Sequence, residues 1–93
     1  MHGESKLKSP GEKLISIKLT YWDRIDDIQI LGDFFIHPEE SLALLENSIK
    51  GMSAGASEAE FAETIRLTAD RNSISMIGIS PESVAKAIRM AMS

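Results

Sequence analysis

The spacing of apolar residues changes once along this chain, near Pro38, and this change limits the folds that the chain can adopt. From Ile15 to Tyr21 every second residue is apolar or aromatic, as in a strand with one buried face. After Pro38, apolar residues recur every three or four positions, as on one side of an amphipathic helix. A chain whose main strands precede its helices builds an antiparallel sheet with helices gathered on one face. The sequence therefore predicts an α+β fold with a three-stranded antiparallel sheet and about three helices.

Turn and capping residues give the approximate bounds of these elements. Pro10-Gly11 suits the centre of a type II turn, because proline fixes the first φ and glycine accepts a positive second one. Asp23-Arg24 marks a second turn, and Pro38, Ser57 and Ser80 are typical of helix starts. We expect strands at about 4–8, 13–22 and 25–35 and helices at about 38–50, 57–71 and 80–92, all in a single domain over residues 1–93.

The start of the third strand has two interpretations. Ile25 and Ile28 are three positions apart, so a regular strand would place their side chains on opposite faces. Either a bulge lies near Asp26-Asp27, or Ile25 belongs to the turn. The sequence leaves both interpretations open.

Composition excludes several classes of function. The 93 residues include no cysteine, which removes disulfides, thiolate nucleophiles and cysteine-bound metal centres. The net charge is −4, whereas nucleic-acid binders usually carry a strongly basic face. No apolar run approaches the roughly 20 residues of a membrane-spanning helix. We therefore expect a cytoplasmic protein that binds neither nucleic acid nor a membrane.

Three groups of residues suggest chemistry, and each has a simpler structural explanation. His37 has acidic neighbours, but it directly precedes a predicted helix start, and no second histidine stands at metal-ligand spacing. Asp26 and Asp27 are adjacent, and adjacent strand residues point to opposite faces. The small residues of Gly51–Ala56 precede a helix, where anions can bind, but the lysine of a phosphate-binding loop is missing. We predict no catalytic residue and no metal ligand in this chain.

The most unusual segment is Gly32-Asp33-Phe34-Phe35. Glycine within a strand often marks a close approach of two backbone segments, and two of the three phenylalanines follow it. In one interpretation, one phenylalanine enters the core, the other lies under the helix from Pro38, and Asp33 bonds local N–H groups. In the other, the segment is a binding interface. The two interpretations are compatible.

Two stretches of the chain resemble the C-terminal accessory domain of lipoate-protein ligases. They are Lys8-Ser9-Pro10-Gly11-Glu12-Lys13-Leu14 and the segment from Ile28 to Glu46, in which Gly-Asp-Phe-Phe is followed by Pro-Glu. Ile49-Lys50-Gly51 also fits, so the resemblance covers about residues 6–51, and the segment from Ile77 to Glu82 is loosely similar. The resemblance implies a fold similar to that of iron–sulfur scaffold proteins of the SufE/NifU type, whose cysteine chemistry this chain lacks.

The resemblance also implies a function. The catalytic domain of such a ligase, whose motifs are missing here, uses ATP, Mg²⁺ and lipoate to form lipoyl-adenylate and then modifies lysines of lipoyl domains. This chain looks like the separate small subunit of a bipartite, archaeal-type ligase. It would form a heterodimer with the catalytic subunit, bind no cofactor alone and be required for adenylation. It would act by ordering loops of its partner and excluding water from the reaction.

The expected contact surface contains six residues. Five of them match family positions: Lys13, Gly32, Asp33, Phe34 and Phe35. Trp22 is added because an exposed tryptophan often anchors an interface, and Lys8 and Lys18 are possible charge contacts. Lys13 equally suits a charge that keeps an edge strand from aggregating.

Other classes of function are also considered. A self-contained interaction or dimerisation module would use the sheet face that the helices leave free. An RNA-binding domain of the KH type needs a Gly-x-x-Gly loop, whereas this chain has Gly-x-x-x-Gly at residues 51–55 and an acidic balance. A stand-alone enzyme is the least favoured, because no catalytic group is predicted.

Overall fold

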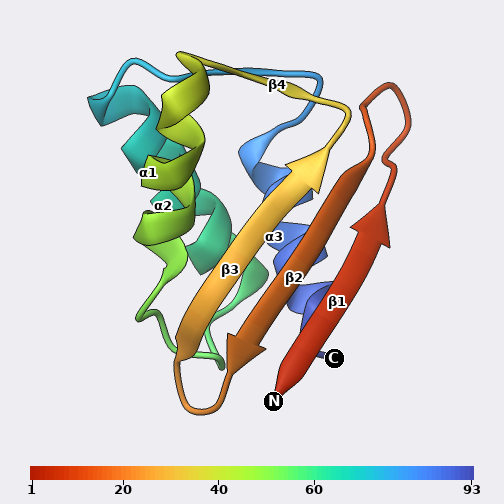
Figure 1. Cartoon of the computed structure of the whole chain (residues 1–93), viewed down its shortest axis with the longest axis vertical. Helices are drawn as coiled ribbons and strands as arrows, with labels where there is room; N and C mark the ends of the chain where they lie inside the picture. The colour runs from red at the N-terminus through yellow and green to blue at the C-terminus, as the bar shows by residue number, and fades with distance from the viewer.

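The computed structural model describes residues 1–93 and contains two antiparallel sheets (Figure 1). The larger sheet has the strand order β1-β2-β3, from strands His2–Leu7, Ile15–Tyr21 and Ile25–Gly32. The smaller sheet pairs β4 (Phe35–His37) with β5 (Ser75–Ile77). The helices are α1 (Leu42–Ile49), α2 (Glu58–Arg71) and α3 (Pro81–Ala91), with a 3-10 turn at Glu39–Ser41.

All three helices lie on the same side of the larger sheet. Helix α3 packs against β1 and β2, α1 packs against β3, and α2 packs against the other two helices (Figure 1). The opposite face of the sheet has no helix on it. The predicted α+β fold, a three-stranded antiparallel sheet with about three helices on one face, is confirmed.

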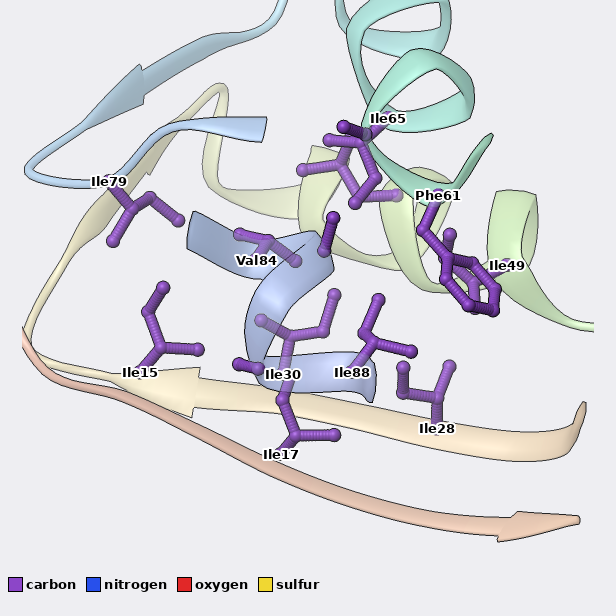
Figure 2. Packing of buried hydrophobic residues seen from close by; sticks show 14 of the residues in the cluster. Ile15, Ile17, Ile28, Ile30, Ile49, Phe61, Ile65, Ile79, Val84 and Ile88 are labelled. Carbon is purple, nitrogen blue, oxygen red and sulfur yellow. The ribbon is translucent and has the colours of Figure 1, made fainter. Parts of the chain in front are cut away.

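The core lies between the sheet and the helices. In β2 the apolar side chains of Ile15, Ile17 and Leu19 are buried, while the residues between them are not. Figure 2 shows Ile17 and Ile30 of the sheet facing Val84 and Ile88 of α3. Each fully buried side chain of this size stabilises the fold by about 1.5–3 kcal/mol. The core therefore depends on the period-two pattern that the sequence displays.

The first hairpin turns at the predicted residues. The N–H of Glu12 donates to the carbonyl oxygen of Ser9 at 3.0 Å, and Gly11 has a φ of +77°. This is the geometry of a type II turn. The strands on either side are offset from the predicted 4–8 and 13–22, because β1 begins at His2 and β2 begins only at Ile15.

The start of β3 contains a bulge. Asp27 lies opposite Thr20, and Ile25 lies opposite the next residue, Tyr21, so Asp26 is the extra residue. The bulge allows both Ile25 and Ile28 to be buried. Of the two interpretations that the sequence left open, the bulge is the one found.

The predicted third strand, 25–35, is wrong over its last residues. Strand β3 ends at Gly32, whose φ is +153°. The chain then leaves the larger sheet, and the next extended residues pair with β5 instead of β2. The physical reason is a pairing with a segment about forty residues later, which no local pattern reveals.

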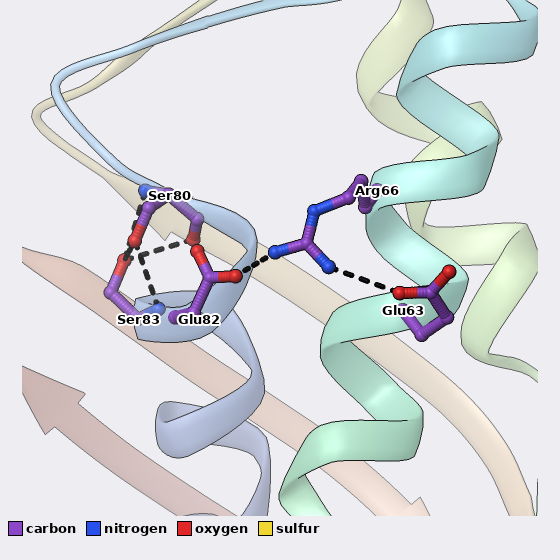
Figure 3. A network of polar contacts seen from close by, with 5 residues as sticks. All are labelled: Glu63, Arg66, Ser80, Glu82 and Ser83. Atoms are coloured by element: carbon purple, nitrogen blue, oxygen red, sulfur yellow. Dashed lines mark hydrogen bonds and ion pairs between the residues drawn. The ribbon is translucent and has the colours of Figure 1, made fainter.

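The helix starts differ in how they are capped. Pro38 precedes the 3-10 turn, and α1 begins only at Leu42, so the predicted helix at 38–50 starts later than expected. Ser57 and Ser80 cap α2 and α3, each with a reciprocal bond to the residue three positions on. Figure 3 shows the side chain of Arg66 on α2 placed between Glu63 and Glu82, which links α2 to α3 at the surface.

None of the helices combines the length and the apolar character that crossing a membrane requires.

Candidate functional site

The candidate residues fall at two opposite ends of the larger sheet. Gly32 is the last residue of β3 and Asp33–Phe35 follow it, and Lys13 precedes the start of β2, which pairs with that end of β3. Trp22 follows the far end of β2, in the turn that leads to β3 (Figure 1). One surface can therefore contain the first five residues but not Trp22.

Gly32 lies against the backbone that leads into β2. A Cβ atom at position 32 would overlap the carbonyl oxygen of Leu14 and lie 3.1 Å from Cδ2 of Phe34. The same carbonyl oxygen accepts a hydrogen bond from the N–H of Asp33 at 3.2 Å. Glycine is required here both for its φ and for space. The close approach suggested by the sequence is present.

Lys13 makes a second contact of this kind, with Gly78 after β5. The N–H of Lys13 donates to the carbonyl oxygen of Gly78 at 2.7 Å. A Cβ atom at position 78 would lie 2.7 Å from Cγ of Lys13 and 3.8 Å from Cβ of Phe34. The aliphatic part of the Lys13 side chain therefore covers Gly78, which has a φ of +91°. The two-stranded sheet of β4 and β5, called the ribbon from here on, is therefore anchored before β4, at Gly32, and after β5, at Gly78.

The ribbon presents apolar side chains to solvent. Phe35 and Ile77 lie directly opposite each other, and their exposed fractions are 70% and 55%. Phe34 is half-buried and packs against the core. The two phenylalanines therefore have different environments: Phe34 supports the fold, and Phe35 is free to contact another molecule.

A shallow groove runs beside Phe35. Its lining includes Leu31, which is 46% exposed, together with Leu42 and Glu39. The remaining lining comes from the neighbouring residues of β3 and β4: Ile30, Gly32, Phe34 and Ile36. Ile77 and Leu31 were not among the sequence candidates. The only signal for Ile77 was its place in the loosely similar segment from Ile77 to Glu82.

Trp22 is the most exposed large apolar side chain, at 72%. The backbone N–H of Trp22 donates to the carbonyl oxygen of Arg24 at 3.1 Å, which closes the turn between β2 and β3. The exposure fits an interface anchor, but this turn lies at the opposite end of the larger sheet from β4 (Figure 1). Lys18 lies mid-strand on β2 and is exposed, and Nζ of Lys8 donates to the backbone oxygen of Glu12 at 3.0 Å.

Comparison with solved structures identifies a relative of this chain. A scan against known protein families and a search of curated protein sequences give no match. A solved structure of an archaeal lipoylation system from Thermoplasma acidophilum, a bi-partite lipoate protein ligase and its E2 lipoyl domain, does match. Its matching chain is 31% identical, the alignment covers 96% of both chains, and the TM-score is 0.78. The chain belongs to the accessory-subunit family of bipartite lipoate-protein ligases.

Membership of the accessory-subunit family extends beyond the segment that suggested it. The resemblance was specific over residues 6–51, whereas the structural match covers 96% of the chain. The helices α2 and α3 and the strand β5 therefore belong to the same fold. Within this accessory subunit, Gly32 and Phe34 have structural roles, and so has the backbone of Lys13.

Two of the other groups considered for chemistry, Asp27 and the loop at 51–56, have structural partners. Asp27 pairs with Nζ of Lys50 at 3.2 Å, and this hydrogen bond is the main reason that the pKa of the Asp27 carboxyl lies below its ordinary value. The loop at 51–56 bonds back to the β2–β3 turn, since the N–H of Ala54 donates to the backbone carbonyl oxygen of Asp23 at 2.9 Å. No group of three or more histidine, aspartate or glutamate side chains is arranged to hold a metal ion.

Proposed function

We propose that this chain is the accessory subunit of a two-chain lipoate-protein ligase and is required for the ATP-dependent activation of lipoate. The catalytic subunit would bind ATP, Mg²⁺ and lipoate, form lipoyl-adenylate and transfer the lipoyl group to lysines of lipoyl domains. The observation that supports this proposal is the match, at 31% identity and 96% coverage of both chains, to a chain from a bi-partite lipoate protein ligase system. A cytoplasmic location stays a prediction.

In this proposal the chain acts on its partner and contributes no reacting group. It docks on the catalytic subunit, orders the loops around the bound nucleotide and keeps water from the mixed anhydride of lipoyl-adenylate. Lys13, Gly32, Asp33, Phe34 and Phe35 are proposed to form or support the contact surface. Trp22, at the other end of the sheet, is not part of this surface.

The experiment is an adenylation assay. Lipoate-dependent formation of lipoyl-adenylate is measured with the cognate catalytic subunit, with and without this chain. Activity that requires the chain supports the proposal, and selective loss with Asp33→Ala or Phe35→Ala, in variants that still fold, places the working surface at Gly32–Phe35. Transfer from synthetic lipoyl-adenylate should depend less on the chain.

The alternative function is an independent dimerisation module. The sheet face opposite the helices is free, and a shallow polar hollow on it is lined by Glu4, Lys18, Thr20 and Gln29 among others. Full adenylation without the chain, together with self-association of the chain alone, would favour this alternative.

A further inference from the structure

The ribbon of β4 and β5 carries apolar residues on both of its sides. Directly opposite residues of an antiparallel pair project to the same side, so Phe35 and Ile77 share the outer side. Ile36 and Met76, also opposite each other, lie on the inner side against the core. The next pair on the outer side, His37 and Ser75, is polar and exposed, as expected of a surface ribbon that serves only the fold. The apolar pair of Phe35 and Ile77 therefore calls for another explanation.

We propose that the catalytic subunit of the ligase docks on the ridge formed by Leu31, Phe35 and Ile77. This inference rests on the proposed function and adds to it the surface that is used. It includes two residues, Leu31 and Ile77, that the sequence did not suggest, and it leaves Trp22 outside the contact. It also separates contact residues from the residues that hold the ridge in place.

The ridge is held rigid before any partner arrives. The approach of Gly32 to Leu14 fixes the entry to β4, and the bond from the N–H of Lys13 to Gly78 fixes the exit from β5 at 2.7 Å. A side chain on a fixed backbone loses less conformational freedom on binding than one on a mobile loop. Phe35 is therefore a preorganised anchor.

The surroundings of the ridge have the composition of an interface. The groove beside Phe35 forms the centre, where most of the lining residues are apolar and Glu39 supplies a charge. Lys13 and Asp33, both exposed, neighbour Gly78 and Gly32 at the same end of the molecule. An apolar centre with a charged rim is the usual arrangement at protein interfaces.

The small size of the ridge, together with the match to a chain from a bi-partite ligase system, favours a catalytic subunit over a second copy of the chain. A stable interface buries about 800 Å² on each partner, and three partly exposed side chains supply much less. A symmetric pair that met only at the ridge would fall short of this area. A catalytic subunit that binds the ridge can also contact the charged residues beside it, such as Lys13 and Asp33. The ridge thus serves as an anchor within a wider contact.

Affinity measurements with matched variants test this inference. The full chain carries Phe35→Thr or Ile77→Thr, because threonine favours strands and removes most of the apolar area. Trp22→Thr is the control, since it removes an equally exposed aromatic side chain from the other end of the sheet. Binding to the cognate catalytic subunit is measured by calorimetry, and thermal unfolding shows that each variant is folded.

We expect Phe35→Thr to weaken binding at least about 30-fold, as for an interface hot spot. Ile77→Thr should weaken it in the same direction, and Trp22→Thr should leave it within about threefold. If the wild-type chain does not bind the catalytic subunit, both the proposed function and this inference are refuted. If the wild-type chain binds and the ridge variants bind equally well, only the ridge is refuted.

Sedimentation of the chain alone distinguishes the two molecules that could occupy the ridge, the catalytic subunit and a second copy of the chain. A monomer agrees with docking of the catalytic subunit. A dimer that Phe35→Thr dissociates would assign the ridge to a second copy and overturn the inference.

Discussion

Gly32 lies against Leu14 so closely that a Cβ atom at position 32 would overlap the Leu14 carbonyl oxygen. That oxygen also accepts the N–H of Asp33, at 3.2 Å. The chain leaves β3 immediately afterwards, and its next extended residues join β5. The contact between these two residues therefore sets the point at which the larger sheet ends and the ribbon begins.

Replacing Gly32 with alanine should destabilise the protein by about 2 kcal/mol or more, because a side chain at a φ of +153° is strained and the Cβ atom must displace Leu14. Urea unfolding measures the loss. Gly55→Ala is the matched control, since its nearest heavy atom would be 3.6 Å away, and it should change stability by no more than about 0.5 kcal/mol. Equal effects of the two substitutions would contradict the steric explanation.

Glu46 on α1 protects the outer edge of β3. Its Oε2 atom accepts the N–H of Ile30 at 2.9 Å, a group that β3, as an edge strand, cannot pair within the sheet. Glu46→Leu should cost about 1–3 kcal/mol, since it leaves this partly buried N–H without a partner. Glu46→Gln keeps an acceptor oxygen and should cost less. Thermal unfolding of the two variants compares them, and a more stable leucine variant would show that the bond contributes nothing.

The carboxyl group of Asp27 should titrate below the ordinary range of aspartate. The hydrogen bond from Lys50 is the main cause of the lowered pKa, followed by the N–H of Ile28 and the charge of Lys50. The stabilising contribution is present above the pKa of the unfolded state and is lost as the pH falls through the lower pKa of the folded state. Because both side chains are substantially exposed, the effect on stability should be small.

The side-chain carboxyl shift of Asp27, followed by NMR against pH, checks this prediction. Lys50→Gln should raise the pKa of Asp27 towards its ordinary value, while Lys86→Gln, on α3, should leave it unchanged. If the pKa of Asp27 is the same in the Lys50→Gln variant as in the wild-type protein, the ion pair does not persist in solution.

Arg89 ties α3 to the segment that joins α1 to α2. Its Nη1 atom donates to the carbonyl oxygen of Ala54 at 2.6 Å and to that of Ala56 at 3.4 Å. Arg89→Met keeps much of the aliphatic stem and removes both bonds, so it should destabilise the protein by about 1–2 kcal/mol. The amide of Ala54, which donates to Asp23, should then exchange faster with solvent. Arg71→Met, at the exposed end of α2, is the control and should leave that exchange rate unchanged.

The parts of the fold that local patterns determine could be predicted from the sequence. Alternation located β2, because Ile15, Ile17 and Leu19 must share one face. Capping chemistry located α2 and α3, since Ser57 and Ser80 accept the N–H groups that those helix starts leave free. The turn at Pro10-Gly11 could also be predicted, because its type depends on the two central residues themselves.

The parts that depend on distant partners could not be predicted. Strand β5 has only three residues and no readable period, and β4 becomes a strand only by pairing with it. Ile77 was therefore overlooked as the neighbour of Phe35. The separation of Trp22 from Phe35 was implied by the antiparallel order itself, because one residue follows β2 and the other follows β3. The role of the candidate residues in contact with a partner stays a prediction.

The β4–β5 pairing also has a consequence for the order in which the molecule folds. The pairing closes a loop that contains both α1 and α2. The chain entropy lost in closing this loop is offset only after much of the loop has become ordered. The ribbon should therefore be among the last elements to form. A newly made chain with unpacked helices would not yet hold Phe35 beside Ile77. The apolar surface would therefore be complete only in molecules that have finished folding.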